Sequence, residues 1–332
     1  MGRYFRRKAM IYAVTFVVAV TLSWLIPRLM PGDPISSMVA RQGGVQQAES
    51  FRAMEEYYNR VFGFDLPLWR QYLNYWGELF QGNFGISVFA FPKPVGELIT
   101  AALPYSIGLL LPAILLSWYV GNKLGAAAAR RRSLDNTVLP LSYLLTATPY
   151  VWMAILLSWA LGVVWGAFPT AFGYDQTLVP QWSWMFVGSV LSHWFLPFLS
   201  LFLVLVGGWA IGMRNLVIYE LETDYANYLY ALGAPNRLVR RYAFRNSLLP
   251  QLTGLALQLG VIVAGNIVTE VVFAYPGLGY LILQAIQRSD FFLLQGVLLF
   301  VVIGVLIANF LIDIAYVIVD PRTRTGLQGG TQ

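Results

Sequence analysis

The chain has 332 residues, of which 58% are hydrophobic and only 11% are charged, and its formal net charge at pH 7 is +6. Because soluble domains typically carry about 25% charged residues, this composition excludes an ordinary soluble domain and indicates an integral membrane protein. The sequence contains no cysteine, which excludes disulfides, thiolate metal sites and a cysteine nucleophile. We expect no nucleic-acid partner, because the arginines gather at the expected membrane edges.

The first part of the chain predicts one span followed by a more polar outer segment. An arginine-rich start precedes an apolar run from about Ala9 to Met30, which is too long for a signal peptide and lacks a small-residue cleavage site. Two prolines in PGDP, residues 31–34, are expected to end this helix. In the extracytoplasmic segment 31–101, apolar side chains recur at helical spacing, which predicts one or two amphipathic helices against the outer membrane surface. These side chains are Leu68, Tyr72, Tyr75, Leu79 and Phe80.

Five further spans are predicted within a core of residues 102–319, before a polar tail at 320–332. They cover about Ala102–Ala129, Val138–Gly166, His193–Leu216, Leu248–Phe273 and Phe291–Val319. The first region, residues 1–30, comprises a cytoplasmic N-terminus and the first span. Lysine and arginine gather at this N-terminus, at 130–132, at 237–245 and in the tail, whereas 167–192 contains none. By the positive-inside rule, both termini are cytoplasmic. The predicted fold class is an all-α integral membrane protein with six transmembrane helices.

The sequence offers little for catalysis. None of its three lysines follows the glycine-rich pattern of a phosphate-binding loop, so the chain is not expected to bind ATP by that route. His193 is the sole histidine and cannot build a paired-histidine zinc site, and no nucleophile elbow accompanies it. We expect an interfacial hydrogen bond there, with a membrane enzyme centred on His193 as a remote alternative.

Charged side chains within spans are costly and therefore informative. Asn266 and Glu270 are expected in the fifth span toward the outer side, and Asp313 in the inner half of the sixth. A proton-coupled carrier could use Glu270 and Asp313 as relay carboxylates. Capping, pairing or contact with a partner subunit is the simpler interpretation, which we prefer for Asp313 and leave open for Glu270. With so few buried charges, a secondary carrier is the minority interpretation.

The stretch Asp224–Pro250, DYANYLYALGAPNRLVRRYAFRNSLLP, is the most informative part of the chain. It predicts a short helix broken at Gly233-Ala234-Pro235, followed by an arginine-rich approach to the next span. An ordinary cytoplasmic loop whose arginines only set topology is the alternative.

Four runs together carry a family resemblance. They are PGDP at 31–34, YWGELFQGNFGISVFAFPKPVGELI at 75–99, EVVFAYPGLGYLILQAIQRSDF at 270–291, and DPR at 320–322. The chain resembles the permease subunits of peptide-type ABC importers, which take up dipeptides, oligopeptides, nickel chelates and some oligosaccharides. PGDP and the FAYPGLG run point to the first-permease (DppB/OppB-like) branch.

The resemblance implies that residues of about 224–236 form a coupling helix seated in a groove on an ATPase subunit. We map the coupling residues onto Asp224, Tyr225, Ala226, Tyr228, Ala231, Gly233, Ala234, Arg237, Arg245 and Pro250, the last at the start of the next helix. Four apolar or aromatic residues are expected to fill the groove. These are Tyr225, Tyr228, Leu229 and Leu232. The usual family run alternates alanine with arginine and lysine before the glycine, so the more apolar run here implies a groove adapted to it.

The resemblance also implies the rest of the machine. Partners would be a second, homologous permease, two ABC ATPase subunits, an extracytoplasmic substrate-binding protein and the lipids of a prokaryotic inner membrane. No cofactor is expected in this chain, because ATP and magnesium would bind the ATPase subunits. Peptides are the leading cargo and oligosaccharides the alternative, since aromatic residues, 15% of the chain, suit sugar stacking. Asn266 and Glu270 are candidate contacts with the pathway or a partner.

Overall fold

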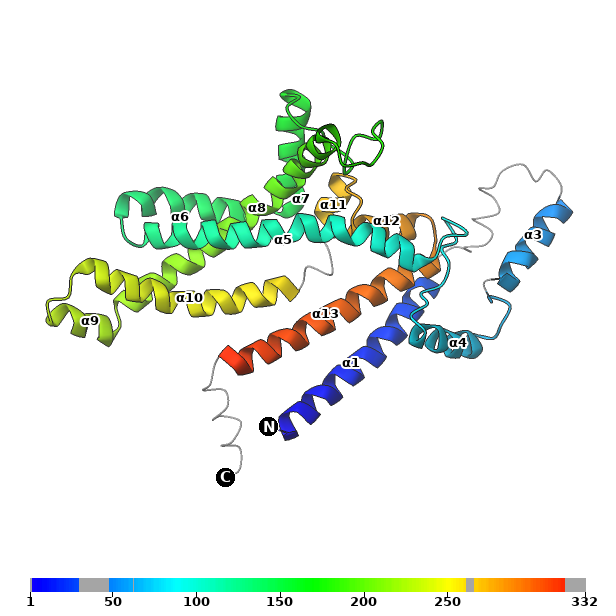
Figure 1. The fold of residues 1–332 in the computed structure, drawn as a ribbon, viewed down its shortest axis with the longest axis horizontal. Coiled ribbons are helices and arrows are strands. Elements are labelled where there is room, and N and C mark those ends of the chain that lie inside the picture. The colour runs from blue at the N-terminus through cyan, green and yellow to red at the C-terminus, as the bar shows by residue number, and fades with distance from the viewer. Residues whose placement is uncertain (1, 30–47, 62, 261–265, 320–332) are drawn as a thin grey trace. The chain divides into compact units, whose positions relative to one another are not determined.

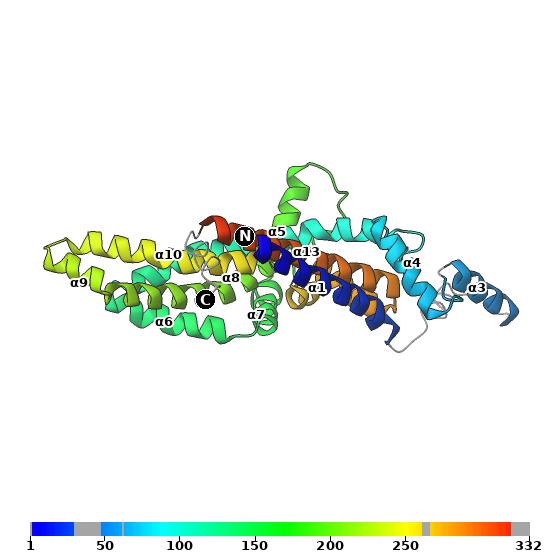
Figure 2. The ribbon, with the colours of Figure 1, turned by 90° about the horizontal axis from the view of Figure 1, so that it is seen from below.

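The computed structural model describes residues 2–29, 48–61, 63–260 and 266–319, and within these ranges all regular elements are helical (Figures 1 and 2). An isolated antiparallel bridge joins Ile86 and Pro94. The helices are α1 (Gly2–Arg28), α3 (Ala48–Val61), α4 (Leu68–Phe80), α5 (Val95–Ala128), α6 (Arg132–Ala147), α7 (Tyr150–Leu157), the π-helix η1 (Ser158–Val164), α8 (Trp184–Leu221), α9 (Asp224–Ala231), α10 (Asn236–Gly260), α11 (Ile267–Val272), α12 (Leu278–Gln287) and α13 (Phe291–Val319).

In the described part of the chain, four helices are long and apolar enough to cross a membrane, and a bent pair adds a fifth candidate. The four are α1 over Ala9–Arg28, α5, α8, and α13 over Phe291–Phe310. The bent pair joins α6 to α7 and η1 at an angle of 100°. The expected third span is therefore not one straight helix. It breaks at Pro149, which has no N–H to donate, and Thr148 before it is extended, with ψ of 121°.

Two other expected spans, the fourth and the fifth, differ from the structure or lie partly outside the described residues. The expected fifth span includes residues 261–265, which lie outside the described residues, as do PGDP and the DPR tail. On either side of that gap lie the end of α10 and the short α11. Helix α8 begins at Trp184, earlier than the expected His193, because Ser183 caps it by accepting a hydrogen bond from the Phe186 N–H at 3.3 Å.

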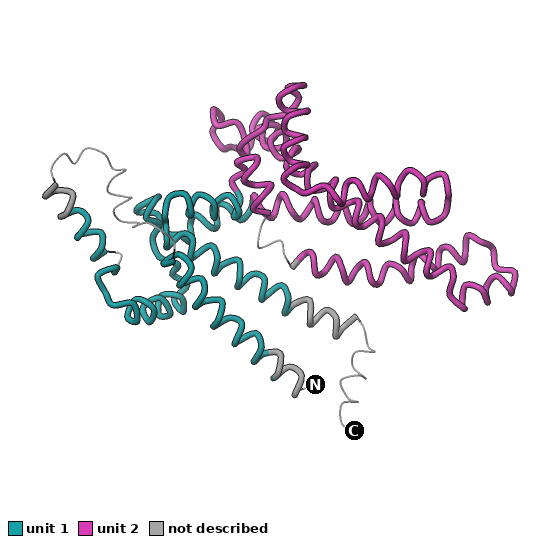
Figure 3. The backbone as a smooth tube through the Cα atoms, turned by 180° about the vertical axis from the view of Figure 1, so that it is seen from behind, with its two compact units in different colours: residues 1–104, 277–332 teal, residues 105–276 magenta. Residues whose placement is uncertain are grey.

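The chain divides into two compact units, residues 1–104 with 277–332 and residues 105–276 (Figure 3). In the first unit, α1 packs beside α13. Tyr75 of α4 is buried with Val20 and Leu299, and Tyr72 and Leu79 pack against this cluster. The predicted helix is confirmed, its placement against the outer membrane surface stays a prediction, and these three side chains form its protein-facing side. Leu68 and Phe80 do not belong to it, because they are 62% and 79% exposed.

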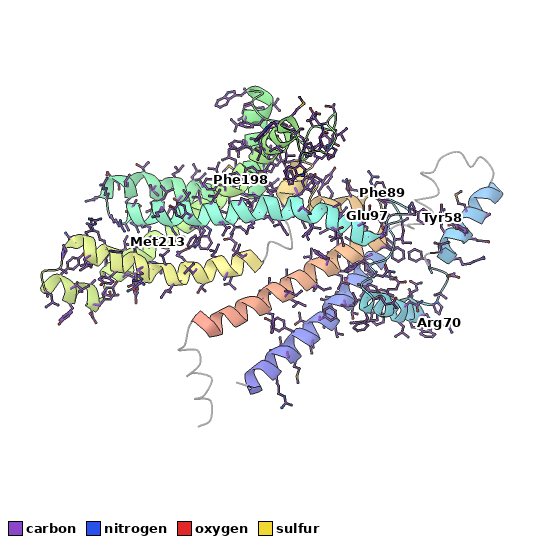
Figure 4. The ribbon with its side chains drawn as sticks, in the orientation of Figure 1. Tyr58, Arg70, Phe89, Glu97, Phe198 and Met213 are labelled. Atoms are coloured by element: carbon purple, nitrogen blue, oxygen red, sulfur yellow. The ribbon has the colours of Figure 1, made fainter. Side chains whose placement is uncertain are left out.

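In the second unit, glycines allow close approach between helices. A Cβ at Gly121 of α5 would lie 2.5 Å from the Trp209 Cβ of α8, and one at Gly125 would overlap the Ala210 carbonyl oxygen. Since Gly121 and Gly125 are one helical turn apart, they form a flat strip on which the α8 backbone rests. The buried Met213 of α8, labelled in Figure 4, packs in the next part of the same interface with Ala126.

Candidate functional site

Helix α9 and the turn after it form a defined local structure within Asp224–Pro250. The helix begins at Asp224, whose negative charge suits a helix N-terminus, and ends at Ala231. Gly233 then adopts φ of +78° and donates its N–H to the Tyr230 carbonyl at 3.0 Å. The Ala234 N–H reaches back to the Leu229 carbonyl, also at 3.0 Å, which completes a Schellman motif. The predicted break at Gly233 is confirmed, although the helix ends earlier than the expected residue 236.

A carboxylate at the end of α8 holds α9 and α10 together. Glu220 Oε2 accepts hydrogen bonds from the Tyr225 hydroxyl of α9 at 2.8 Å and from the Asn246 amide of α10 at 3.1 Å. Its backbone carbonyl accepts from the Thr223 hydroxyl at 2.6 Å. We call Glu220, Tyr225 and Asn246 the Glu220 clamp. It ties the loop helix directly to a long membrane-type helix.

The clamp also affects the ionisation of its tyrosine. Partial burial raises the pKa of Tyr225, and the hydrogen bond to the Glu220 carboxylate raises it further. Tyr225 therefore remains a protonated donor at physiological pH. Sequence reasoning missed Glu220. The one signal that could have pointed to it is its position as an acidic residue in the last turn of α8, shortly before Tyr225.

The two faces of α9 differ sharply. Ala226 is completely buried, whereas Tyr228 and Leu232 are each 65% exposed. Ala231 is exposed beside them, and the predicted contact of Tyr228 and Leu232 with a groove on another protein stays a prediction. Tyr225 was expected in the same set, but its hydroxyl is held by Glu220 within the chain.

The first half of α10 presents the predicted arginines outward. Val239, Ala243 and Ser247 recur every four residues and are buried, which places one face of the helix on the protein. Arg237 and Arg245 lie among the exposed residues. Pro250 was expected at the start of the next helix, but α10 begins at Asn236 and contains Pro250 in its interior. A packed membrane helix tolerates this because neighbours can satisfy the carbonyl that proline leaves free.

Asn266 and Glu270 have structural partners. The Asn266 side chain caps α11 by accepting a hydrogen bond from the Thr269 N–H at 3.0 Å. Glu270 is fully buried, and its Oε1 accepts a hydrogen bond from the Ser106 hydroxyl of α5 at 2.7 Å. The bond between Ser106 and Glu270 holds α11 against α5. The backbone of Asp313 lies in α13, and its side chain lies outside the described residues.

His193 makes a local hydrogen bond. Its Nδ1 lies 2.8 Å from the Ser189 carbonyl oxygen one turn earlier in α8. A carbonyl can only accept, so Nδ1 carries the proton, and Ser192 is the neighbouring hydroxyl at 3.4 Å. Among the described residues, no group of three or more His, Cys, Asp or Glu side chains is arranged to hold a metal. The arrangement is a local side-chain-to-backbone hydrogen bond within α8 and gives no support to the histidine enzyme.

A groove lies where the bent span breaks. It has a volume of about 460 Å³ and is lined from the break itself, from α8 and from α10. Its polar contributors include Thr146, Tyr150 and Gln258. Sequence reasoning named none of them, because a proline within an apolar run does not reveal whether the helix bends there.

The comparisons with known proteins settle the family. Residues 121–325 match the binding-protein-dependent transport system inner membrane component, an interval that includes the whole of α8, α9 and α10. The chain is 31% identical to the di/tripeptide transport system permease protein DppB of Pseudomonas aeruginosa (strain UCBPP-PA14), covering 98% of this chain and 99% of that protein. The chain belongs to this family.

Other permeases in the family give the same result. The oligopeptide transport system permease protein AppB of Bacillus subtilis (strain 168) is 29% identical, with 97% of this chain and 99% of that protein covered. The dipeptide transport system permease protein DppB of Escherichia coli (strain K12) is 28% identical, with 98% and 99% covered. The resemblance to peptide-type importer permeases is confirmed. The chain is a membrane component of a transport system, not a catalytic enzyme.

Proposed function

We propose that this permease forms half of the pathway of an ATP-driven importer of di- and oligopeptides. The supporting observation is that permeases named for di/tripeptide, dipeptide and oligopeptide transport match it over 97–98% of its length. A second permease would form the other half, two ATPase subunits would bind ATP and magnesium, and an extracytoplasmic binding protein would deliver the peptide. These relatives favour peptide over the oligosaccharide alternative.

In the proposed topology, the chain crosses the membrane six times with both termini in the cytoplasm. The bent α6–α7 pair is the third crossing, and residues from α10 through α11 are the fifth. Arg130 and Arg237 line one cleft, which supports placing the 130–132 loop and the start of α10 on the same side. By the positive-inside rule, that side is the cytoplasm. The Asp224–Pro250 stretch then faces the ATPase subunits.

In the proposed mechanism, α9 is the coupling helix. Tyr228 and Leu232 supply an exposed apolar surface for a groove on the ATPase subunit. When ATP binding moves that groove, α9 moves with it, and the Glu220 clamp passes the displacement to α8 and α10. Rigid transmission requires such a link, because α9 on its own has only eight residues and could rotate about its two short connections.

The proposed peptide pathway includes the groove at the break in the third crossing. The groove at the break in the third crossing brings hydroxyl and amide groups together with Trp209, which suits the mixed polar and apolar surface of a peptide. Asn266 and Glu270 remain predicted contacts with the pathway or a partner, and their internal hydrogen bonds would also hold α11 in place.

The coupling assignment can be tested in proteoliposomes that contain the complete importer. A charge introduced by Ala231→Glu or Leu232→Glu, or deletion of Leu232, should abolish ATP-driven peptide uptake while leaving membrane insertion normal. Val179→Glu adds the same charge at another exposed apolar position, in the 167–192 connection, and should leave uptake intact. Normal uptake and normal binding-protein-stimulated ATP hydrolysis in all three α9 variants would refute the coupling role. Screening peptides and oligosaccharides for stimulation of ATP hydrolysis tests the cargo.

A further inference from the structure

Two adjoining clefts lie between the end of α5 and the first turns of α10. The larger, of about 710 Å³, is lined by Arg130, Pro235, Arg237, Leu238, Arg241 and Phe244. The smaller, of about 390 Å³, is lined by Ala127, Arg130, Arg131, Leu134, Arg237 and Arg240. Arg130 and Arg237 line both clefts, so the two clefts adjoin and share two of their arginines, and we call them together the basic site.

Among the described residues, no ion pair balances the charges of this site. The site contains five arginines, and no described carboxylate forms an ion pair with any of them. By contrast, Arg214 of the same unit makes a two-pronged pair with Asp135, at 2.9 and 2.6 Å. Five unneutralised guanidinium groups around one space repel each other, and a bound anion would relieve that repulsion.

The residues that line the two clefts indicate which kind of anion would bind. Guanidinium groups bind phosphate oxygens in a forked geometry, and each cleft offers at least three of them. The lining also contains apolar side chains, Leu134, Leu238 and Phe244, which a free inorganic anion would not use. A ligand with two linked phosphates and adjoining hydrocarbon satisfies both clefts and both kinds of surface.

We propose that the paired clefts bind the headgroup of an anionic phospholipid with two phosphodiesters, a diphosphatidyl lipid of the cardiolipin type. The proposal rests on the cytoplasmic placement of this face, where basic pockets between membrane helices meet lipid headgroups. Because the site includes Pro235 and Arg237, directly after the α9 turn, the lipid would fix the start of α10 against the end of α5. The membrane lipid would thereby set how firmly the coupling segment is held.

The test uses the complete importer in nanodiscs of phosphatidylcholine with added phosphatidylglycerol or cardiolipin at equal phosphate content. Bound lipid is counted by native mass spectrometry. Cardiolipin should bind at least tenfold more tightly than phosphatidylglycerol, and each of Arg131→Gln, Arg240→Gln and Arg241→Gln should weaken it about fivefold. The corresponding lysine variants keep the charge but lose the fork, and should weaken it less. The double variant Arg60→Gln with Arg70→Gln removes charge from the first unit and should leave binding unchanged.

Three outcomes would overturn the proposal. Equal binding of cardiolipin and phosphatidylglycerol would show only a diffuse charge effect. Full competition by soluble pyrophosphate would assign the clefts to a free phosphate compound. Loss of ATPase subunits from the detergent-purified arginine variants, without any change in lipid binding, would make the site a protein contact. None of these results depends on peptide uptake, so they leave the proposed transport function to its own test.

Discussion

Removing one hydroxyl from the Glu220 clamp tests the link between α9 and the membrane helices. Tyr225→Phe deletes the hydroxyl that lies 2.8 Å from Glu220 Oε2 and keeps the aromatic ring. The bond from Asn246 to the same oxygen remains, at 3.1 Å. The variant therefore weakens the attachment of α9 without removing any of the exposed surface that we assign to the ATPase groove.

The structure sets the expected size of the effect. Hydrogen bonds to charged groups contribute about 1.5–3 kcal/mol when well shielded, and this one is only partly buried, so we expect about 1–2 kcal/mol. A loss of that size changes a local equilibrium by a factor of about 5–30. Amide hydrogens of α9 that exchange through local opening should therefore exchange about 5–30 times faster. Amides of α8 before its last turn should be unaffected.

Hydrogen-exchange mass spectrometry on the purified importer measures this directly. Tyr230→Phe is the matched control, because it removes a partly exposed hydroxyl from the same helix and leaves the clamp intact. Glu220→Gln retains an acceptor oxygen but removes the charge, so its effect on α9 should be smaller than that of removing the acceptor altogether. If exchange in Tyr225→Phe stays within twofold of the unmodified protein while the helix remains folded, the clamp does not hold α9.

Two further predictions concern the packing of the second unit. Gly125→Leu should prevent normal assembly, because a side chain there meets the α8 backbone. Gly108→Leu changes a glycine of the same helix that faces open space and should assemble normally. Equal yields of the folded complex from the two variants would contradict this prediction. In a double-mutant cycle of Asp135→Asn and Arg214→Gln, thermal unfolding should give a coupling of about 1–2 kcal/mol, since the pair is bidentate and its side chains are only 22% and 24% exposed. A coupling near zero would show that the pair does not hold α6 to α8.

Local sequence signals predicted the short helix after Asp224 and its break at Gly233. Gly233 could be placed at a helix end because only glycine adopts a left-handed turn without strain, and the structure gives it φ of +78°. Membrane helices were equally accessible from long apolar runs, as in α5 and α8. These features depend on neighbours in the sequence, which is why a single sequence is enough to find them.

Features that depend on contact between distant segments were not predicted. α6 ends just before Pro149, whereas Pro197 lies inside the continuous α8, and both prolines stand within long apolar runs, so the presence of a proline does not by itself tell a bend from a straight span. Glu220 acquires its role only because Asn246 of α10 approaches it from another helix. Leu68 and Phe80 share the helical spacing of the apolar positions of α4 but lie outside its contact with the cluster around Val20.

Some arginines only orient the chain in the membrane, whereas others also line the basic clefts. Orientation by the positive-inside rule requires only that basic residues lie near the ends of spans, and it does not depend on how their side chains pack. Arg132 and Arg245 meet that requirement as well as Arg130 and Arg237 do, but only the latter two line both clefts. The preference for arginine over lysine holds throughout this sequence and therefore does not by itself argue for a phosphate site. What argues for one is that residues from two distant loops surround the same space beside apolar side chains, a convergence that orientation in the membrane does not require.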